Sequence, residues 1–236
     1  MLARNRQPEI MDDPQLDSEK HLEALRGLER INAWSGSARL IWPLISALAR
    51  ENLSVPLRVL DIATGGGDIP ITLQHRARQS NLSNIVFAGC DLSERAMQYA
   101  RERAARVKAT IDFFPLDVLH QSLPPDFDVV MASLFTHHLD AEQVVELLKR
   151  MGQAARRMVI INDLRRSRGG LLLAQLATRI LSRSDVVHTD GPLSVHAAYT
   201  IHEMREMAEQ AGLTGAKVER CWPCRLRLVW SRKTVL

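Results

Sequence analysis

The chain has 236 residues, of which 46% are hydrophobic and 25% are charged, and its formal net charge at pH 7 is +4. This composition argues against a disordered or fibrous protein. We expect no membrane-spanning helix because no run of 18 apolar residues occurs, and three cysteines are too few for a disulfide framework. The charged N-terminal stretch lacks the apolar core of a signal peptide, which favours a cytoplasmic location. The small, dispersed basic excess predicts no nucleic-acid partner.

The N-terminal quarter is predicted to be helical after a short arm. Residues 1–17 are polar, contain two prolines, and are expected to form a flexible arm. Residues 18–55 are expected to form a helical cover made of two helices with Gly36 between them. The first helix has apolar residues at a spacing of three (Leu22, Leu25, Leu28 and Ile31), and the second runs over about 38–50.

From residue 56 onward, strands and helices alternate. Strands are predicted at 57–62, 84–90, 111–114, 128–132 and 158–161, and helices at 68–78, 93–107 and 141–155. Connections of this length require right-handed crossovers between parallel strands. The pattern therefore predicts an α/β fold, a doubly wound and mostly parallel sheet with helices on both faces.

The alternation of strands and helices ends after the fifth strand. We expect an apolar helix at 169–182, a loop at 184–200, a helix at 201–211, and a closing antiparallel hairpin formed by 218–222 and 226–230. One domain then spans 56–236, its sheet has seven strands with an antiparallel strand near the C-terminus, and residues 164–200 form a lid-like insertion.

A glycine loop follows the first predicted strand, with Gly65, Gly66 and Gly67 leading into a helix. Such a loop lets a ligand approach the backbone at the carboxyl edge of a parallel sheet. Pro70 occupies the position where a dinucleotide site needs a small residue, and Asp68 would repel a phosphate at the helix N-terminus. This disfavours a nicotinamide-dependent reductase, and the acidic loop favours a cationic or neutral ligand.

Three acids lie where successive strands should end. Asp61 lies late in the first strand, Asp91 follows the second strand, and Asp117 follows the third. Each acid alone could be a cap or turn residue. Together they favour a binding site, because the carboxyl ends of parallel strands meet at one edge of the sheet.

This set of residues resembles the class I S-adenosylmethionine-dependent methyltransferases over about residues 34–232, most specifically at 57–70. The resemblance implies a Rossmann-like fold and S-adenosylmethionine as the cofactor. It assigns the methionine part of the cofactor to Asp61, Ala63, Gly65 and Gly67, and the ribose to Asp91 and Leu92. Asp117 and Val118 are assigned to the adenine, and Ser133, at the end of the fourth strand, is also expected to bind the cofactor. The family usually has glycine where this chain has Ala63, and the extra methyl group is tolerable if φ at this residue is negative.

The stretch after the fourth strand bears on the acceptor. Ser133 to Thr136 differs from the Asn/Asp-Pro-Pro-Tyr/Phe pattern of enzymes that methylate base amino groups, and it resembles small-molecule methyltransferases of quinone and polyketide pathways. In those enzymes a histidine often follows this strand. His138, ahead of His137, is therefore a candidate general base, since imidazole accepts protons near neutral pH; helix capping or packing is the alternative.

The end of the fifth strand argues against a metal. Catechol methyltransferases place metal ligands at the positions of Asn162 and Asp163, but Ser133 replaces the matching acid of the fourth strand, so no metal is expected. Asn162 and Asp163 are instead expected to line the substrate side.

The insertion carries the remaining substrate predictions. His188 and Tyr199 are expected to contact substrate, and the stretches 162–167 and 190–194 resemble a bacterial group of methyltransferases of type III polyketide and phenolic-lipid pathways. The apolar helix at 169–181, bracketed by arginines, needs a surface to cover it: the domain body, a homodimer partner, a hydrophobic substrate or a peripheral membrane contact.

Taken together, these patterns predict methyl transfer from S-adenosylmethionine to a small, hydrophobic, aromatic acceptor. O-methylation of a phenolic or quinone-like acceptor is the leading hypothesis. The alternatives are an RNA or protein methyltransferase and a non-catalytic S-adenosylmethionine-binding partner protein.

Overall fold

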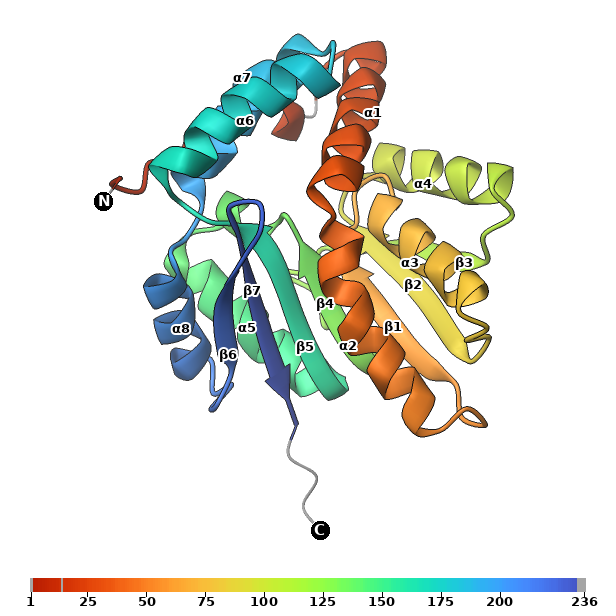
Figure 1. Cartoon of the computed structure of the whole chain (residues 1–236). Coiled ribbons are helices and arrows are strands. Elements are labelled where there is room, and N and C mark those ends of the chain that lie inside the picture. Colours follow the sequence, from red (N-terminus) through yellow and green to blue (C-terminus); the bar gives the residue numbers. More distant parts are fainter. Residues whose placement is uncertain (1, 14, 233–236) are drawn as a thin grey trace.

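The computed structural model describes residues 2–13 and 15–232, and these residues form one seven-stranded sheet (Figure 1). The strand order is β3-β2-β1-β4-β5-β7-β6, in which β1 to β5 are parallel and β7 runs antiparallel to both β5 and β6. The strands are β1 Leu57–Ile62, β2 Ile85–Asp91, β3 Ile111–Pro115, β4 Phe127–Ser133, β5 Ala155–Leu164, β6 Lys217–Cys221 and β7 Arg225–Ser231. The predicted Rossmann-like sheet with an antiparallel C-terminal strand is confirmed.

Helices cover both faces of this sheet and its carboxyl edge. They are α1 Ser18–Ser35, α2 Ser37–Glu51, α3 Asp68–Gln79, α4 Glu94–Arg106, α5 Ala141–Ala154, α6 Arg168–Leu181, α7 Asp185–Ala197 and α8 Ile201–Gln210, with short 3-10 turns η1 Ile10–Asp12 and η2 Thr136–His138. Helices α2, α3 and α4 pack on one face, and α5 and α8 pack on the other. The alternation of side chains along each strand supplies both cores: Val59 faces α2 and α3, whereas Leu60 faces α5.

Three helices form a roof over the carboxyl edge of the parallel strands: α1, α6 and α7 (Figure 1). Two glycines permit their close approach. A Cβ at Gly27 of α1 would lie 2.3 Å from Ser182 Oγ, and one at Gly191 of α7 would lie 2.5 Å from a methyl carbon of Thr178 on α6. The roof therefore rests on backbone-to-side-chain contacts that any larger residue would disturb.

The prediction of a loop at 184–200 was wrong over most of its length. Residues Asp185–Ala197 form α7 even though Gly191 and Pro192 lie inside it. Tertiary packing overrides the weak helix propensity, because Val186, Val187 and Val195 are buried against the rest of the roof. The helix 201–211, the hairpin and the two N-terminal helices agree with the sequence.

The N-terminal arm is bound to the domain, in contrast to the flexible arm expected from its composition. Arg4 donates hydrogen bonds to the carbonyls of Ala197 and Leu139, at 2.7 and 2.6 Å, and Arg6 donates one to the carbonyl of His138 at 2.6 Å. The carboxylate of Asp190 accepts from the backbone amides of residues 10 and 11. These partners lie far away in the sequence, which explains why local composition did not show them.

The outer face of α6 remains apolar and exposed. Leu172, Leu176 and Ile180 are 60, 53 and 78% exposed, while Ala177 packs inward. The homodimer and the peripheral membrane contact therefore stay predictions for this face. Among the described helices, none combines the length and the apolar character needed to cross a membrane.

Candidate active site

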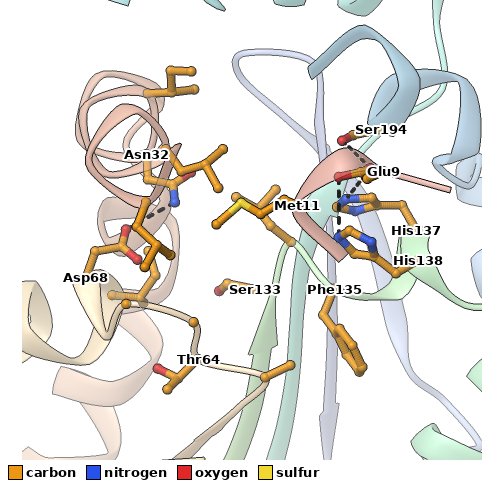
Figure 2. A pocket seen from close by; sticks show the side chains of 18 of the residues that line it. Glu9, Met11, Asn32, Thr64, Asp68, Ser133, Phe135, His137, His138 and Ser194 are labelled. Carbon is orange, nitrogen blue, oxygen red and sulfur yellow. Dashed lines mark hydrogen bonds and ion pairs between the residues drawn. The ribbon is translucent and has the colours of Figure 1, made fainter. Parts of the chain in front are cut away.

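A cavity of about 930 Å³ lies between the roof and the carboxyl edge of the sheet. Figure 2 shows its two ends: Thr64 and Asp68 of the glycine-loop region lie with Asn32 on one side, Glu9, His137 and His138 lie on the other, and Met11 and Ser133 lie between them. The roof contributes apolar side chains to the lining: Leu25, Leu28, Ile31, Leu173, Val187 and Val195.

The glycine loop adopts a left-handed backbone at three positions. Gly65 and Gly67 have φ of +53° and +70°, and Ala63 has φ of +50°. The condition of a negative φ at Ala63 is therefore not met, and this alanine adopts a conformation that costs about 1–2 kcal/mol for a residue with a Cβ. Ala63 and Gly65 line the cavity. Gly67 lies behind it, where a Cβ would come within 2.7 Å of the Phe113 ring.

Asp61 is a buried acid at this end of the cavity. Its Oδ2 accepts a 2.6 Å hydrogen bond from the Thr64 hydroxyl, and its Oδ1 is buried with no partner among the described residues. Burial is the main cause that raises the pKa of Asp61 to about 8. The carboxylates of Asp68 and Asp91 also raise this pKa, whereas the Thr64 hydrogen bond lowers it. The site thus holds a carboxyl group that gains by meeting a cation.

Asp91 connects the end of β2 to the loop. Its two oxygens accept 2.9 Å hydrogen bonds from the backbone amides of Gly65 and Ser93. Burial raises its pKa, and these amide hydrogen bonds oppose the shift. A carboxylate has about four lone-pair positions, so Asp91 retains room for two hydroxyl groups. Leu92 follows it at the cavity lining, with its side chain largely exposed.

The third predicted pair also lines the cavity. Asp117 closes a turn after β3 by accepting from the amides of Leu119 and His120 and by binding the His120 ring at 2.8 Å. This ring contact is the main cause of its lowered pKa. Val118 is buried beside it. Ser133, at the end of β4, lines the cavity with a buried hydroxyl that has no partner in the part of the chain described.

The opposite end is built on η2. His137 is 3% exposed, and its Nδ1 lies 2.7 Å from Oδ1 of the buried Asp163 on β5. Burial alone would raise the pKa of Asp163, but His137, together with the Thr136 hydroxyl, lowers it to about 2. Because Asp163 is an anion, Nδ1 of His137 carries the shared proton, and Nε2 is left as the acceptor.

Glu9 reaches this end from the N-terminal arm. Its Oε1 accepts a 2.6 Å hydrogen bond from Ser194 of α7 and lies 3.8 Å from Nε2 of His137, and its Oε2 lies 3.9 Å from Nε2 of His138. The two histidine rings stack with centroids 4.3 Å apart. Chain segments from residues 9, 137–138 and 194 thus meet at one point.

Four residues expected on the substrate side do not line the cavity. Tyr199 is buried and donates to the carbonyl of Leu139 at 2.8 Å, under the Arg4 guanidinium. His188 binds the carbonyl of Ser182 at 2.9 Å and joins α6 to α7. Asn162 is fully buried in β5. Asp163 is also buried, and it binds His137, which itself lines the cavity. Tyr199, His188 and Asp163 are thus bound within the fold, whereas the side-chain amide of Asn162 is buried with no hydrogen-bond partner among the residues described.

Several cavity residues were not predicted. Glu9 gave no local signal, because a glutamate in a polar arm is ordinary. Asp68 was noted for its charge alone, but it accepts from Asn32 of α1 at 3.1 Å. Arg225 of β7 is fully buried and donates to Ser35 at 2.5 Å; burial lowers its pKa to about 10, and its Nη1 has no partner among the residues described. From the sequence, only the position of Arg225 next to the strand expected at 226–230 could have indicated its part in the site.

Comparison with known sequences agrees with this geometry. Residues 59–157 match a family model described as a methyltransferase domain. The demethylmenaquinone methyltransferase of Deinococcus radiodurans is 32% identical over 118 residues, 49% of this chain and 47% of that protein. The release factor glutamine methyltransferase of Flavobacterium psychrophilum is 30% identical over 95 residues, 38% of this chain and 32% of that protein. The matched region thus spans less than half the length of these relatives.

Solved structures show the same fold over nearly the whole chain. Magnesium protoporphyrin IX methyltransferase from Synechocystis, with S-adenosylhomocysteine bound, superposes with a TM-score of 0.56 at 17% identity and covers 95% of this chain and 91% of its own. The plantazolicin methyltransferase BpumL, in complex with a monoazolic desmethylPZN analogue and S-adenosylhomocysteine, gives a TM-score of 0.63 at 16% identity and covers 91% of this chain and 97% of its own. The fold is that of the class I S-adenosylmethionine-dependent methyltransferases. Within this fold, residues 59–157 are the part of the chain that matches the model of a methyltransferase domain.

Proposed function

We propose that this protein transfers a methyl group from S-adenosylmethionine to an oxygen of a small, apolar, aromatic acceptor. The observation that carries the proposal is a single roofed cavity with the glycine loop at one end and the His137–Asp163 pair at the other. The demethylmenaquinone methyltransferase relative supports a quinone-like or phenolic acceptor.

The side chains at the first end fit the cofactor. Its methionine part carries an ammonium group and a carboxylate, and the cavity residues Asp61 and Arg225 offer an oxygen and a guanidinium nitrogen that have no partners among the residues described. Asp91 would hold the ribose hydroxyls, and Asp117 with Val118 would face the adenine. Charged groups that lack partners in the folded protein gain most from a ligand of opposite charge.

The second end supplies the proton acceptor. When bound, the cofactor supplies an activated methyl group on a sulfonium. Nε2 of His137 would accept the hydroxyl proton that the acceptor oxygen loses when it gains the methyl group. Asp163 holds the ring in the required tautomer and stabilises the imidazolium that results. We favour His137 for this step over His138, the histidine placed first on sequence grounds, because its ring is buried and its Nδ1 lies 2.7 Å from the carboxylate of Asp163.

The roof favours a small acceptor over a protein or an RNA. The acceptor must enter beneath α1, α6 and α7, which contribute aliphatic side chains such as Leu28, Leu173 and Val195 to the lining together with polar ones. Burial there excludes water from the reacting groups and holds the acceptor against the histidine end. A protein or RNA segment would need an open groove, and RNA binding would weaken steeply with salt.

Two measurements test the proposal. Isothermal titration should show S-adenosylhomocysteine binding to the wild type, weakened in Asp61→Asn and unchanged in the control His75→Ala on the exposed face of α3. Incubation with S-adenosylmethionine carrying an isotopically labelled methyl group and a panel of alkylated phenols and quinols should then yield labelled ethers. Absence of cofactor binding overturns the whole proposal. Binding without transfer to any small acceptor supports the non-catalytic alternative, and transfer to RNA or protein alone overturns the acceptor class.

A further inference from the structure

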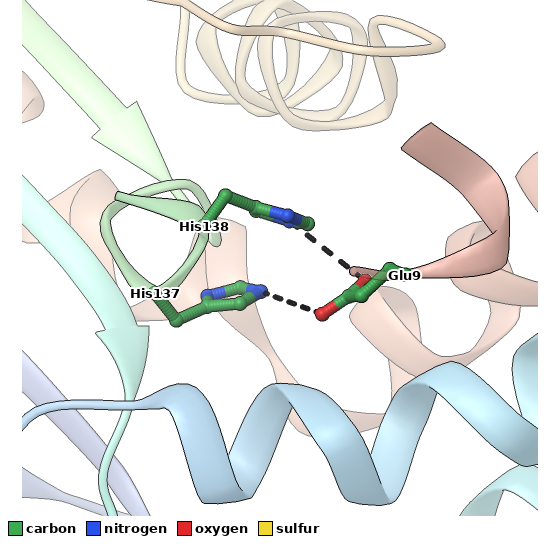
Figure 3. Close-up of side chains that lie close together, drawn as sticks. All are labelled: Glu9, His137 and His138. Atoms are coloured by element: carbon green, nitrogen blue, oxygen red, sulfur yellow. Dashed lines mark ion pairs between the residues drawn. The ribbon is translucent and has the colours of Figure 1, made fainter. Parts of the chain in front are cut away.

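Two histidines and one carboxylate converge at the histidine end of the cavity. The ligand atoms of Glu9, His137 and His138 all lie within 4.8 Å of one another (Figure 3). Both histidines come from η2, and the glutamate comes from the arm, so the cluster exists only when the arm is in place. Two imidazoles and a carboxylate are a ligand set that suits zinc and other divalent d-block cations.

The separations fit a shared cation better than they fit hydrogen bonds. Glu9 oxygens lie 3.8 Å from Nε2 of His137 and 3.9 Å from Nε2 of His138, beyond the length of a hydrogen bond. Two ligand atoms, each about 2.0–2.2 Å from a tetrahedral zinc ion, are roughly 3.4 Å apart. Inward shifts of a few tenths of an ångström would bring each Glu9 oxygen and its histidine nitrogen to this separation, and the ligand atoms of all three residues already lie within 4.8 Å of one another.

The surrounding contacts orient the ligands as metal sites require. Asp163 accepts the Nδ1 proton of His137, which directs the Nε2 lone pair of that ring toward Glu9. Ser194 donates to Oε1 of Glu9 and fixes the carboxylate from α7.

We propose that Glu9, His137 and His138 form a binding site for one divalent transition-metal ion of the zinc class, which fastens the N-terminal arm across the cavity. Water would complete the coordination of a three-residue site. Because the ion would take Nε2 of His137, metal binding and proton acceptance by this ring would exclude each other. Zinc should therefore inhibit methyl transfer while holding the arm closed.

The test uses the full chain, freed of metal by a chelator, and does not depend on methyl transfer. Competition with a chromogenic chelator should show one equivalent of Zn²⁺ per chain, and Co²⁺ should give the visible absorption of a low-coordinate complex. Affinity should fall at least tenfold, and up to about 100-fold or more, in Glu9→Gln and in His138→Ala. The control His75→Ala, which removes an exposed histidine outside the cavity, should bind as the wild type does.

A second readout concerns the arm. Zn²⁺ should slow tryptic cleavage after Arg6 in the wild type but not in Glu9→Gln, and S-adenosylhomocysteine binding by each variant verifies its fold. Failure of the wild type to bind Zn²⁺ or Co²⁺ more tightly than Glu9→Gln overturns the site. Binding that leaves cleavage after Arg6 unchanged overturns the fastening of the arm. Zinc binding without any methyl transfer leaves this site standing and counts against the proposed function alone.

Discussion

Two buried aspartates belong to opposite ends of one cavity, and their acidities diverge. Asp61 beside the glycine loop has a pKa of about 8, whereas Asp163 behind His137 has a pKa of about 2. Burial pushes both values upward, so the difference comes from their partners. Asp163 has an imidazole, a hydroxyl and backbone amides around it, and Asp61 has one hydroxyl and two neighbouring acids.

The two acids therefore have opposite relations to stability and to ligands. The contribution of Asp163 to folding is present above its unfolded pKa of about 3.9 and is lost as pH falls toward 2. Asp61 retains its proton longer in the folded state than in the unfolded state, so it lowers stability as pH rises from about 4 to about 8. Asp163 is satisfied by hydrogen bonds within the fold, whereas one oxygen of Asp61 is left for a ligand to bind.

The largest expected effect is at the histidine end. His137→Ala should lower kcat by roughly 10²- to 10⁴-fold, the usual loss on removing a general base. Affinity for S-adenosylhomocysteine should be unchanged, because the ring lies away from the cofactor loop. Single-turnover kinetics and titration measure the two quantities separately, and a variant that loses both equally would show that the two ends are not independent.

The next effect is at the cofactor end. Asp61→Asn should weaken S-adenosylhomocysteine binding roughly 10- to 100-fold, the range for losing one charged hydrogen bond. The amide keeps the size of the side chain, so circular dichroism should be unchanged. An affinity equal to that of the wild type would remove Asp61 from the cofactor site.

The same carboxyl group predicts a pH dependence. Below pH 8 Asp61 is mostly protonated, and binding of an ammonium group favours its anion, so the complex should release a proton. Affinity for S-adenosylhomocysteine should rise with pH up to about 8 and level off above it. The total rise should be no larger than the loss of affinity caused by Asp61→Asn. Titration in buffers of different ionisation enthalpy detects the proton, and Asp61→Asn should release none.

The smallest effects come from two left-handed positions in the loop. Ala63→Gly removes the strain of a Cβ at φ +50° and should raise the free energy of unfolding by about 0.5–1 kcal/mol, after allowing for the greater entropy of glycine in the unfolded chain. Gly65→Ala, at φ +53° with open space around the new methyl group, should lower it by about 1 kcal/mol. Urea denaturation measures both free energies of unfolding. If both substitutions changed the free energy of unfolding in the same direction, backbone strain could not be the cause.

The sequence predicted one end of this cavity far better than the other, for a physical reason. Asp61, Gly65, Asp91 and Asp117 each lie at or near the end of a strand, so strand order and the parallel sheet bring them together. Glu9, by contrast, meets His137 and Ser194 through contacts across more than a hundred residues, which no periodicity encodes. The left-handed φ of Ala63 could likewise not be predicted from the sequence, because the closure of the loop imposes this conformation and the residue type does not favour it.

The contacts of the arm have a consequence for the order of events during synthesis. Arg4 and Glu9 leave the ribosome well before their partners at 137–139 and 194–197, which are more than a hundred residues further along the chain. The N-terminal arm can therefore complete the cavity only after residues 137–139 and 194–197 have been synthesised. We expect the nascent sheet to assemble with its histidine end still open to solvent and to cellular chaperones.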